Sequence, residues 1–383
     1  MAAEQVKARW VGERWGVMIN RERCKRIVYE AIKTFDLNLA DLIVFTEAAT
    51  GSYLYTPIIA SLAGAKHVYA VTQDSRYGSA EHVRSLTFEV ASSFHVEDNI
   101  SILFQKSHQE VSRCDIITNS GFVRPIDREM ISWMKPTAVI PLMWEPWEFR
   151  EEDLDLEACR EKGILVLGTN EHQPPLDLFP SNGFICMRLL FDAGIEVHHS
   201  KLLILGSFPV AESILRVLRV SDIELGWVCP SGHIEDTSLS SYLIGGKIGE
   251  QQVLKFLEEA DALVVADLTT HDEILGSQSS LSGSLLKKIN PSIVVAHICG
   301  GINAEELRKN NVYLVPDRIM PPGYMSVSAD YLGPKLTIFL NAAGLKVGEA
   351  MARARLLGKS IEESVAYAIK SSPAMTFGGN LYD

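Results

Sequence analysis

The sequence predicts an α/β protein built from two doubly wound domains, each with a parallel sheet. Two observations lead to this fold class. Short apolar runs alternate with segments of helical period, which is the pattern of βαβ units whose sheet is covered on both faces. The chain also has 383 residues, more than the roughly 250–300 that one hydrophobic core usually supports. We therefore expect two domains of the same class.

Two series of apolar runs predict the strands. The first series comprises 42–46, 67–72, 100–104, 114–118, 137–143 and 164–169. The second comprises 201–206, 223–229, 260–267, 292–298 and 311–317. The order of elements in 114–169 resembles that in 260–317, which suggests an internal repeat, although any two doubly wound domains would show a similar order.

The domain boundaries follow from the segments between these series. Segment 180–194 reads as a helix that connects the domains, and a Pro/Gly-rich loop after Asp317 leads into a helical tail. Ser360 and Glu363 fit a capping box at the start of the last helix. Because such a tail commonly packs back on the first domain, we predict a first domain of 1–180 plus 335–383 and a second of 181–334.

Composition limits the class of protein and its partners. Hydrophobic residues make up 47% and charged residues 22% of the chain, as in ordinary globular proteins, and the net charge is -12 without basic runs. We therefore expect neither nucleic acid nor a membrane as partner. The six cysteines are scattered, and segment 1–32 has no apolar core of an export signal. These features predict a cytoplasmic location.

The turn after the strand at 201–206 has the layout of a dinucleotide-binding βαβ start. Gly206 matches the first glycine of G-x-G-x-x-G, but Phe208 replaces the second and Ala211 the third. Phe208 would crowd a pyrophosphate, Pro209 lacks an N–H, and no acid follows the next strand in "WVCPSG". The turn is thus either a nicotinamide site or only its scaffold. The predicted cofactor contacts are Gly206, Ser207, Phe208, Pro209, Val210, Ala211, Asp267 and Thr269.

A second candidate turn lies in the first domain. A strand runs into Glu47, a loop of small residues follows, and Asp74 lies 23 residues after Gly51, close to the spacing at which an acid meets ribose hydroxyls. Asp74 could equally cap the turn "DSRYGS". Asn170 and Glu171 follow the last strand of this domain. The predicted substrate contacts are Glu47, Thr50, Gly51, Ser52, Asp74, Asn170 and Glu171.

Four residues could carry proton transfer or nucleophilic chemistry. Glu145, preferred over Glu148, stands beside tryptophans that would raise its pKa, and His172 follows a strand end. His297 and Cys299 end another strand, where a buried inert thiol is the commoner case. In the alternative interpretation, Glu145 and Glu148 are surface acids, His172 lies in a polar crossover loop, and His297 and Cys299 are core residues. The predicted catalytic residues are Glu145, His172, His297 and Cys299.

No metal site is predicted, because the chain contains no H-x-x-x-H, H-E-x-x-H or paired Cys/His spacing. His172, His271, His297, Glu145 and Asp267 come from different strand ends and could converge, but no motif groups them. His198 and His199 read as a surface turn before the strand at 201–206.

Over about 115–307 the order and spacing of segments resemble the D-isomer-specific 2-hydroxyacid dehydrogenases of the formate/glycerate dehydrogenase type. The stretches "DLDLEACREKGILVLGT" and "ADALVVADLTT" to "HICGG" carry the resemblance. S-adenosylhomocysteine hydrolase is a more distant likeness. The family's catalytic Arg corresponds to Cys299 here, and its "P-H" histidine has no match in 316–334.

The resemblance implies a substrate-binding, flavodoxin-like first domain, a Rossmann-type second domain, NAD or NADP as cofactor, and a homodimer. It also implies an oxidoreductase acting on a small polar metabolite in the inter-domain cleft. The small-residue helix 341–358 could pack against a second copy or only within its own chain. The missing Arg favours an alternative, a ligand-binding or regulatory module without dehydrogenase chemistry.

Overall fold

The structure, a computed structural model, describes residues 20–377 and divides into two units. Unit 1 comprises the residues up to Asp177 together with those from Gly333 onward, and unit 2 comprises Leu178–Leu332. The charged segment 1–19, in which no export signal is expected, lies outside the described residues. Which unit takes substrate and which takes cofactor stays a prediction.

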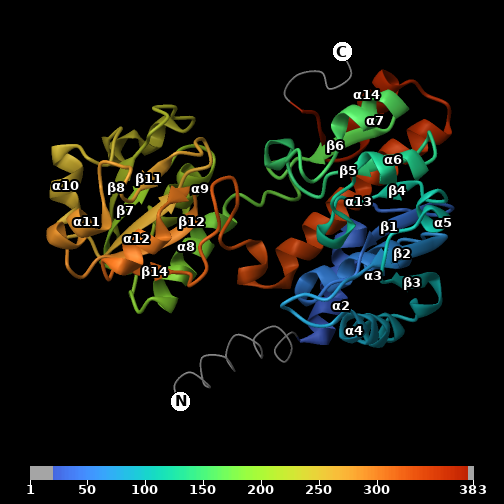
Figure 1. Ribbon diagram of the computed structural model, residues 1–383, viewed down its shortest axis with the longest axis horizontal. Coiled ribbons are helices and arrows are strands. Elements are labelled where there is room, and N and C mark those ends of the chain that lie inside the picture. Colours follow the sequence, from blue (N-terminus) through green and yellow to red (C-terminus); the bar gives the residue numbers. More distant parts are fainter. Residues whose placement is uncertain (1–19, 378–383) are drawn as a thin grey trace. The chain divides into compact units, whose positions relative to one another are not determined.

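Unit 1 is built on a seven-stranded sheet (Figure 1). Its strands are β1 (Ile43–Glu47), β2 (His67–Val71), β3 (Ile100–Leu103), β4 (Ile116–Ile117), β5 (Val139–Pro141), β6 (Leu165–Thr169) and β15 (Ala374–Met375). The parallel strands follow the order 3-2-1-4-5-6, and β15 adds an antiparallel edge beside β6. This is the order of dinucleotide-binding folds. It differs from the 2-1-3-4-5 order of the flavodoxin-like domain expected here.

Helices cover both faces of this sheet. They are α2 (Arg21–Thr34), α3 (Tyr55–Leu62), α4 (Ala80–Ser93), α5 (His108–Val111), α6 (Arg128–Trp133), α7 (Leu156–Lys162), α13 (Pro334–Leu356) and α14 (Ile361–Ser371). The helices α6 and α7 contribute Met130, Ile131 and Cys159 to one core cluster with the strands. The expected capping box of Ser360 and Glu363 is confirmed at the start of α14.

Helix α13 lies against the other face of the sheet of unit 1 through two glycines. A Cβ on Gly348 would lie 2.8 Å from Ile116 Cγ2, and one on Gly344 would lie 2.6 Å from Met143 Sδ. The small residues of this helix are therefore used for close packing within the chain. A homodimer stays a prediction, but this helix no longer supports it.

Unit 2 repeats the topology of unit 1 in a six-stranded sheet (Figure 1). The strands are β7 (Lys201–Leu205), β8 (Glu224–Val228), β9 (Leu243–Gly245), β10 (Ala262–Ala266), β12 (Val294–Cys299) and β14 (Tyr313–Val315). Their order is β9-β8-β7-β10-β12-β14, again 3-2-1-4-5-6 within the unit. A small separate sheet pairs β11 (Glu273–Leu275) with β13 (Gly301–Ile302). Both sheets thus share one strand order, which an internal repeat and two independent doubly wound domains would show alike.

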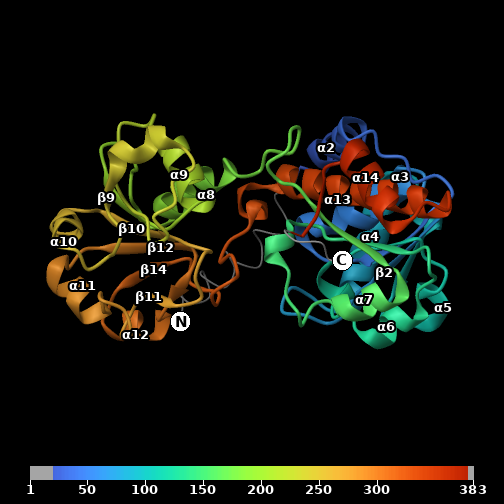
Figure 2. The ribbon, with the colours of Figure 1, turned by 90° about the horizontal axis from the view of Figure 1, so that it is seen from above.

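Helices cover both faces of the sheet of unit 2 (Figure 2), and the alternation of side chains along the strands divides its core into two layers. Its helices are α8 (Ser181–Asp192), α9 (Val210–Leu218), α10 (Gln251–Leu257), α11 (Gly283–Ile289) and α12 (Ala304–Lys309). Leu202 and Ile204 of β7 pack with α8 and α9, whereas Leu203 and Leu205 pack with α10 and α11. The predicted class, α/β with two Rossmann-like parallel sheets, is confirmed.

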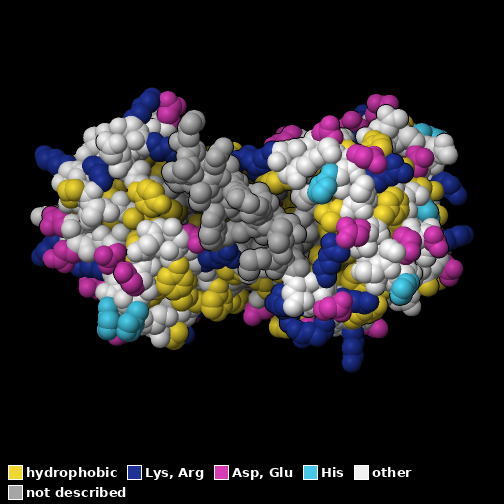
Figure 3. Space-filling view, turned by 90° about the horizontal axis from the view of Figure 1, so that it is seen from below, with side chains coloured by type: hydrophobic (Ala, Val, Ile, Leu, Met, Phe, Trp, Pro, Cys, Tyr) yellow, Lys and Arg dark blue, Asp and Glu magenta, His cyan; other side chains and the backbone are white. Residues whose placement is uncertain are grey.

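Acidic and basic side chains are interspersed over the face of the molecule in Figure 3. Among the described residues, no helix is both long and apolar enough to cross a membrane.

Candidate functional site

The carboxyl ends of β7 and β10 form the topological switch point of unit 2, where open α/β sheets place their ligands. Gly206 follows β7, and a Cβ there would lie 2.0 Å from the carbonyl oxygen of Ala266. The indole N–H of Trp227 donates to the carbonyl of Gly206 at 2.8 Å. The first glycine of the motif is therefore required by space, because no side chain fits between the two strand ends.

A buried polar network joins three loops at this switch point. The hydroxyl of Ser207 donates to Asp267 Oδ2 at 2.9 Å and accepts from the amide of Ser231 at 3.2 Å. Asp267 Oδ1 accepts from the amide of Thr269 at 2.7 Å and from its hydroxyl at 2.6 Å. Asp267 is fully buried, so these bonds compensate its lost hydration. Of the predicted cofactor contacts, Ser207, Asp267 and Thr269 are brought together.

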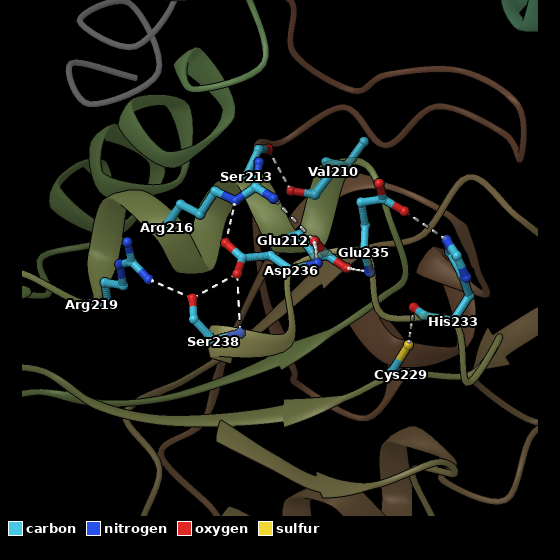
Figure 4. A network of polar contacts seen from close by, with 10 residues as sticks. All are labelled: Val210, Glu212, Ser213, Arg216, Arg219, Cys229, His233, Glu235, Asp236 and Ser238. Atoms are coloured by element: carbon cyan, nitrogen blue, oxygen red, sulfur yellow. Dashed lines mark hydrogen bonds and ion pairs between the residues drawn. The ribbon is translucent and has the colours of Figure 1, made fainter. Parts of the chain in front are cut away.

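The start of α9 is held by a second network, drawn in Figure 4. Glu212 lies fully buried in the first turn, and its carboxylate accepts from the amides of Glu235 at 2.7 Å and Asp236 at 3.0 Å. Arg216 pairs with Asp236 at 2.9 Å. The loop after β8 is thus fastened to α9 by two backbone amides. Sequence reasoning missed Glu212, because its partners lie more than 20 residues away in the chain.

The position of the second glycine is occupied as the sequence suggested. The ring of Phe208 lies edge-on to that of His233, with centroids 5.8 Å apart. Pro209 precedes the first residue of α9, Val210, and Ala211 is buried. The amino end of α9 therefore presents fewer amides than a glycine-rich turn, and an aromatic pair lies beside it.

His297 and Cys299 lie inside β12, and both are fully buried. Nδ1 of His297 lies 2.8 Å from the hydroxyl of Ser326, and its Nε2 donates to the carbonyl of Gly300 at 2.9 Å. Burial lowers the pKa of His297 to about 4. Both ring nitrogens are thus used by the fold, and the Cys299 thiol is enclosed. The structure gives these two predicted catalytic residues the environment of core residues, since neither is accessible to a substrate.

The switch point of unit 1 lies between β1 and β4 and contains Glu47. This buried carboxylate accepts from the amide of Phe122 at 3.1 Å, and a Cβ on Gly121 would lie 2.9 Å from Glu47 Oε2. Burial raises the pKa of Glu47, and the Phe122 amide and nearby Arg124 act against that rise. Thr118 bonds to Thr46 and Ser120 at 2.9 Å. The predicted substrate contact Glu47 therefore bonds to the loop that follows β4.

The small-residue loop after β1 forms a turn that leads into α3. Gly51 has φ +65°, a conformation that favours glycine, and Thr50 makes no side-chain capping bond. Ser52 is buried. Asp74 accepts from the amide of Ala80 at 2.8 Å, which makes it a cap for the start of α4. This bond agrees with the alternative interpretation, in which Asp74 caps the turn "DSRYGS".

A group of three glutamates lies at the ends of β5 and β6. Glu145 is almost fully buried; its carboxylate accepts from the Trp147 indole at 2.6 Å and from the amide of Glu171 at 2.9 Å. His172 Nε2 lies 3.9 Å from Glu145 Oε2. Burial raises the pKa of Glu148 to about 7, with nearby Arg150 opposing and Glu145 adding to the rise. The predicted residues Glu145, Glu171 and His172 are therefore neighbours, and Glu148 joins them.

The pKa of Glu171 is also raised, first by burial and then by the charges of Glu148 and Glu145. The side chain of Asn170 accepts from the amide of His172 at 3.0 Å and shapes the loop. A protonated and an ionised carboxyl side by side can donate and accept a proton near neutral pH. We call Glu145, Glu148 and Glu171 the glutamate cluster.

Comparisons with known proteins support the fold. No family model matches the chain, and no curated protein matches its sequence. A dipicolinate synthase subunit from Bacillus halodurans matches in structure with 12% identity and a TM-score of 0.50, over 80% of this chain and 96% of that one. A dipicolinate synthase chain from Bacillus subtilis matches with 10% identity and a TM-score of 0.50, over 86% and 99%.

A 2-hydroxyacid dehydrogenase from Ketogulonicigenium vulgare also matches, with 13% identity and a TM-score of 0.45, over 84% of this chain and 96% of that one. At 12% and 10% identity, the two dipicolinate synthase structures show that the chain shares their fold.

Proposed function

We propose that the chain is a divergent NAD(P)-dependent oxidoreductase-like enzyme that acts on a small polar metabolite. The nucleotide would bind in unit 2. One observation carries the proposal: the Gly206 turn leads into the amino end of α9 beside the buried network of Ser207, Asp267 and Thr269. Such a switch point is where doubly wound sheets bind nucleotides.

The residues present fit a phosphate-bearing group in part. Gly206 brings the strand end close to β10, α9 has nine residues and presents its amino end, and Thr269 offers an exposed hydroxyl. Pro209 removes one amide, and Phe208 would crowd the approach of a pyrophosphate to the others. When bound, a nicotinamide cofactor would supply or accept the hydride. The exposed Thr269 would contact its polar groups, and the buried Ser207 would hold the turn in place.

Within unit 1, the glutamate cluster would donate and accept a proton. Glu148, whose pKa is about 7, is partly protonated at neutral pH and can donate, while Glu145 is held by Trp147 and the Glu171 amide. His172 is exposed and lies 3.9 Å from Glu145. A small polar metabolite suits such a group, because its hydroxyl or carbonyl can bond to a carboxyl in either protonation state.

The test is calorimetric titration of the full chain with NAD, NADP and, for comparison, S-adenosylhomocysteine. Ala211→Leu should push α9 away from β7 and weaken nucleotide binding by about tenfold or more, whereas Asp74→Ala should leave it unchanged. Circular dichroism must show that both variants are folded. If neither NAD nor NADP bound, the proposal would be refuted. Loss of binding in Gly51→Val, but not in Ala211→Leu, would move the site to unit 1.

A second candidate function is favoured by the burial of His297 and Cys299. Without an accessible catalytic group at the end of β12, unit 2 would bind a nucleotide or related ligand as a regulatory module without turning it over. The two functions are separated by following NADH absorbance with a panel of 2-oxo acids. Tight nucleotide binding without turnover, in wild type and in Glu148→Gln alike, would favour the binding module.

A further inference from the structure

We propose that His198, His199 and Asp222 form a binding site for one divalent transition-metal ion, with Zn²⁺ as its probe. The three side chains come from two loops of unit 2, one before β7 and one before β8. One ligand atom from each lies within 4.8 Å of the other two, and all three residues are exposed. Within residues 20–377 this is the only such group of three histidine, cysteine or acidic side chains.

The closest pair already has the spacing that a metal requires. Nδ1 of His199 lies 3.3 Å from Oδ2 of Asp222. In a tetrahedral site with metal–ligand bonds of about 2.0–2.1 Å, two ligands lie roughly 3.3–3.5 Å apart. The ring of His198 lies beside that of His199, with centroids 3.9 Å apart. A small rotation of the exposed His198 side chain would complete a three-ligand set, with water at the fourth position.

The backbone holds the two loops in register without the ion. The amide of His199 donates to the carbonyl of Asp222 at 3.1 Å, and the amide of Glu224 donates to the carbonyl of Ser200 at 3.0 Å. His199 has φ +60° and Asp222 φ +51°, and Val197, which anchors the first loop in the core, has φ +69°. Since fixed loops present the ligands, binding requires side-chain rotation only.

The local charges also favour a cation. Asp222 contributes a carboxylate, and the nearest lysine along the chain, Lys201, is bonded to Glu224 and Glu259 at 2.9 Å each. Imidazole and carboxylate are ligands that Zn²⁺ accepts, and two histidines favour it over Mg²⁺ or Ca²⁺. The loops precede β7 and β8, at the opposite end of these parallel strands from Gly206. The site is therefore separate from the proposed nucleotide site and would act as a clamp between the two loops.

The experiment is calorimetric titration of the full chain, freed of any purification tag, with ZnCl₂. We expect one ion per chain, and Co²⁺ should give the visible absorption of a low-symmetry site. His199→Asn and Asp222→Asn remove ligands while keeping residues that tolerate a positive φ. Each should weaken Zn²⁺ binding at least about tenfold, since even outer-shell losses cost about 10- to 100-fold.

The matched control is His233→Gln. His233 is likewise exposed in unit 2 and lies 3.6 Å from Glu235, but it belongs to no group of three. This variant should bind Zn²⁺ as the wild type does. Zn²⁺ should also raise the unfolding temperature of the wild type and the control, but not of the Asn variants. Wild-type affinity in both Asn variants, or no Zn²⁺ binding by the wild type, would overturn the proposal.

Discussion

At Gly206 the end of β7 approaches β10 so closely that the backbone leaves no room for a side chain. A Cβ would lie 2.0 Å from the oxygen and 2.4 Å from the carbon of the Ala266 carbonyl. Both atoms belong to a buried central strand, so neither can move without displacing β10. We expect Gly206→Ala to destabilise the chain by about 2–3 kcal/mol, as overpacking of a core does.

Urea denaturation followed by tryptophan fluorescence measures this effect. The control is Gly246→Ala, where the nearest atoms to a new Cβ lie 3.8 and 3.9 Å away and no positive φ is required. Gly246→Ala should stay within about 0.5 kcal/mol of wild type. Equal stability of the two variants would mean that the tight approach at Gly206 is not needed.

Glu148 makes stability depend on pH, because burial raises its pKa to about 7 from the ordinary 4.5. Between these values the folded chain binds a proton that the unfolded chain has released, so unfolding becomes easier as pH rises from about 4.5 to 7. The substitution Glu148→Gln removes this loss of stability at higher pH. At pH 8 the variant should be more stable than wild type by about 1–2 kcal/mol, allowing for partial contact with water, and at pH 4 the difference should vanish.

Denaturation curves at pH 4, 6 and 8 test the Glu148 prediction. The exposed neighbour Glu151 serves as control, and Glu151→Gln should change stability equally little at each pH. A Glu148→Gln variant that follows the wild-type pH profile would contradict a protonated Glu148 in the folded chain.

At the scale of elements, the loop between β8 and β9 depends on one carboxylate of α9. Glu212 accepts two amides of this loop, at 2.7 and 3.0 Å, from a fully buried position. Glu212→Ala leaves both N–H groups without a partner and should cost about 2–3 kcal/mol. Hydrogen–deuterium exchange should become faster over residues 231–238, while the strands keep their protection.

The control for Glu212 is Glu235→Ala. The side chain of Glu235 is exposed and only pairs with His233 at 3.6 Å, so its removal should cost less than about 1 kcal/mol and leave exchange in the loop unchanged. Unchanged exchange in Glu212→Ala would show that the loop is held by other contacts.

The elements that could be predicted are those whose own residues specify them. All five residues of β10 are buried, so a strand covered on both faces appears in the sequence as a continuous apolar run. The two-residue strands β13 and β15 were not expected, because they exist only where their partners β11 and β6 provide a ladder. Local pattern carries no information on such distant pairing.

The same distinction applies to the candidate site. Gly206 and Glu145 could be found because a turn and flanking tryptophans mark them locally. The sequence predicts a catalytic role for His297, because the Ser326 hydroxyl that helps to satisfy it lies 29 residues away and leaves no local mark. Glu212 and Asp222 have partners more than 20 residues distant and carry no motif. Topology, which only the structure supplies, assembles these groups.

At the scale of the whole molecule, the chain builds each sheet from residues of one unit only. Every strand of the six-stranded sheet lies between Lys201 and Val315, and both core clusters of unit 2 are made from Leu178–Leu332. Unit 1 instead needs two separate segments, because α13, α14 and β15 return to its sheet after unit 2 is complete. This difference predicts how fragments of the chain behave.

A fragment of residues 178–332 should fold alone and unfold cooperatively on heating, since it contains a complete doubly wound core. A fragment of residues 1–177 should not, because without α13 the sheet face around Ile116 and Pro141 is uncovered. Joining 333–383 to 1–177 through a flexible Gly/Ser linker should restore its cooperative unfolding. Circular dichroism and calorimetry of the three fragments decide the matter: a folded 1–177 fragment, or an unfolded 178–332 fragment, would contradict the division of the core between the two units.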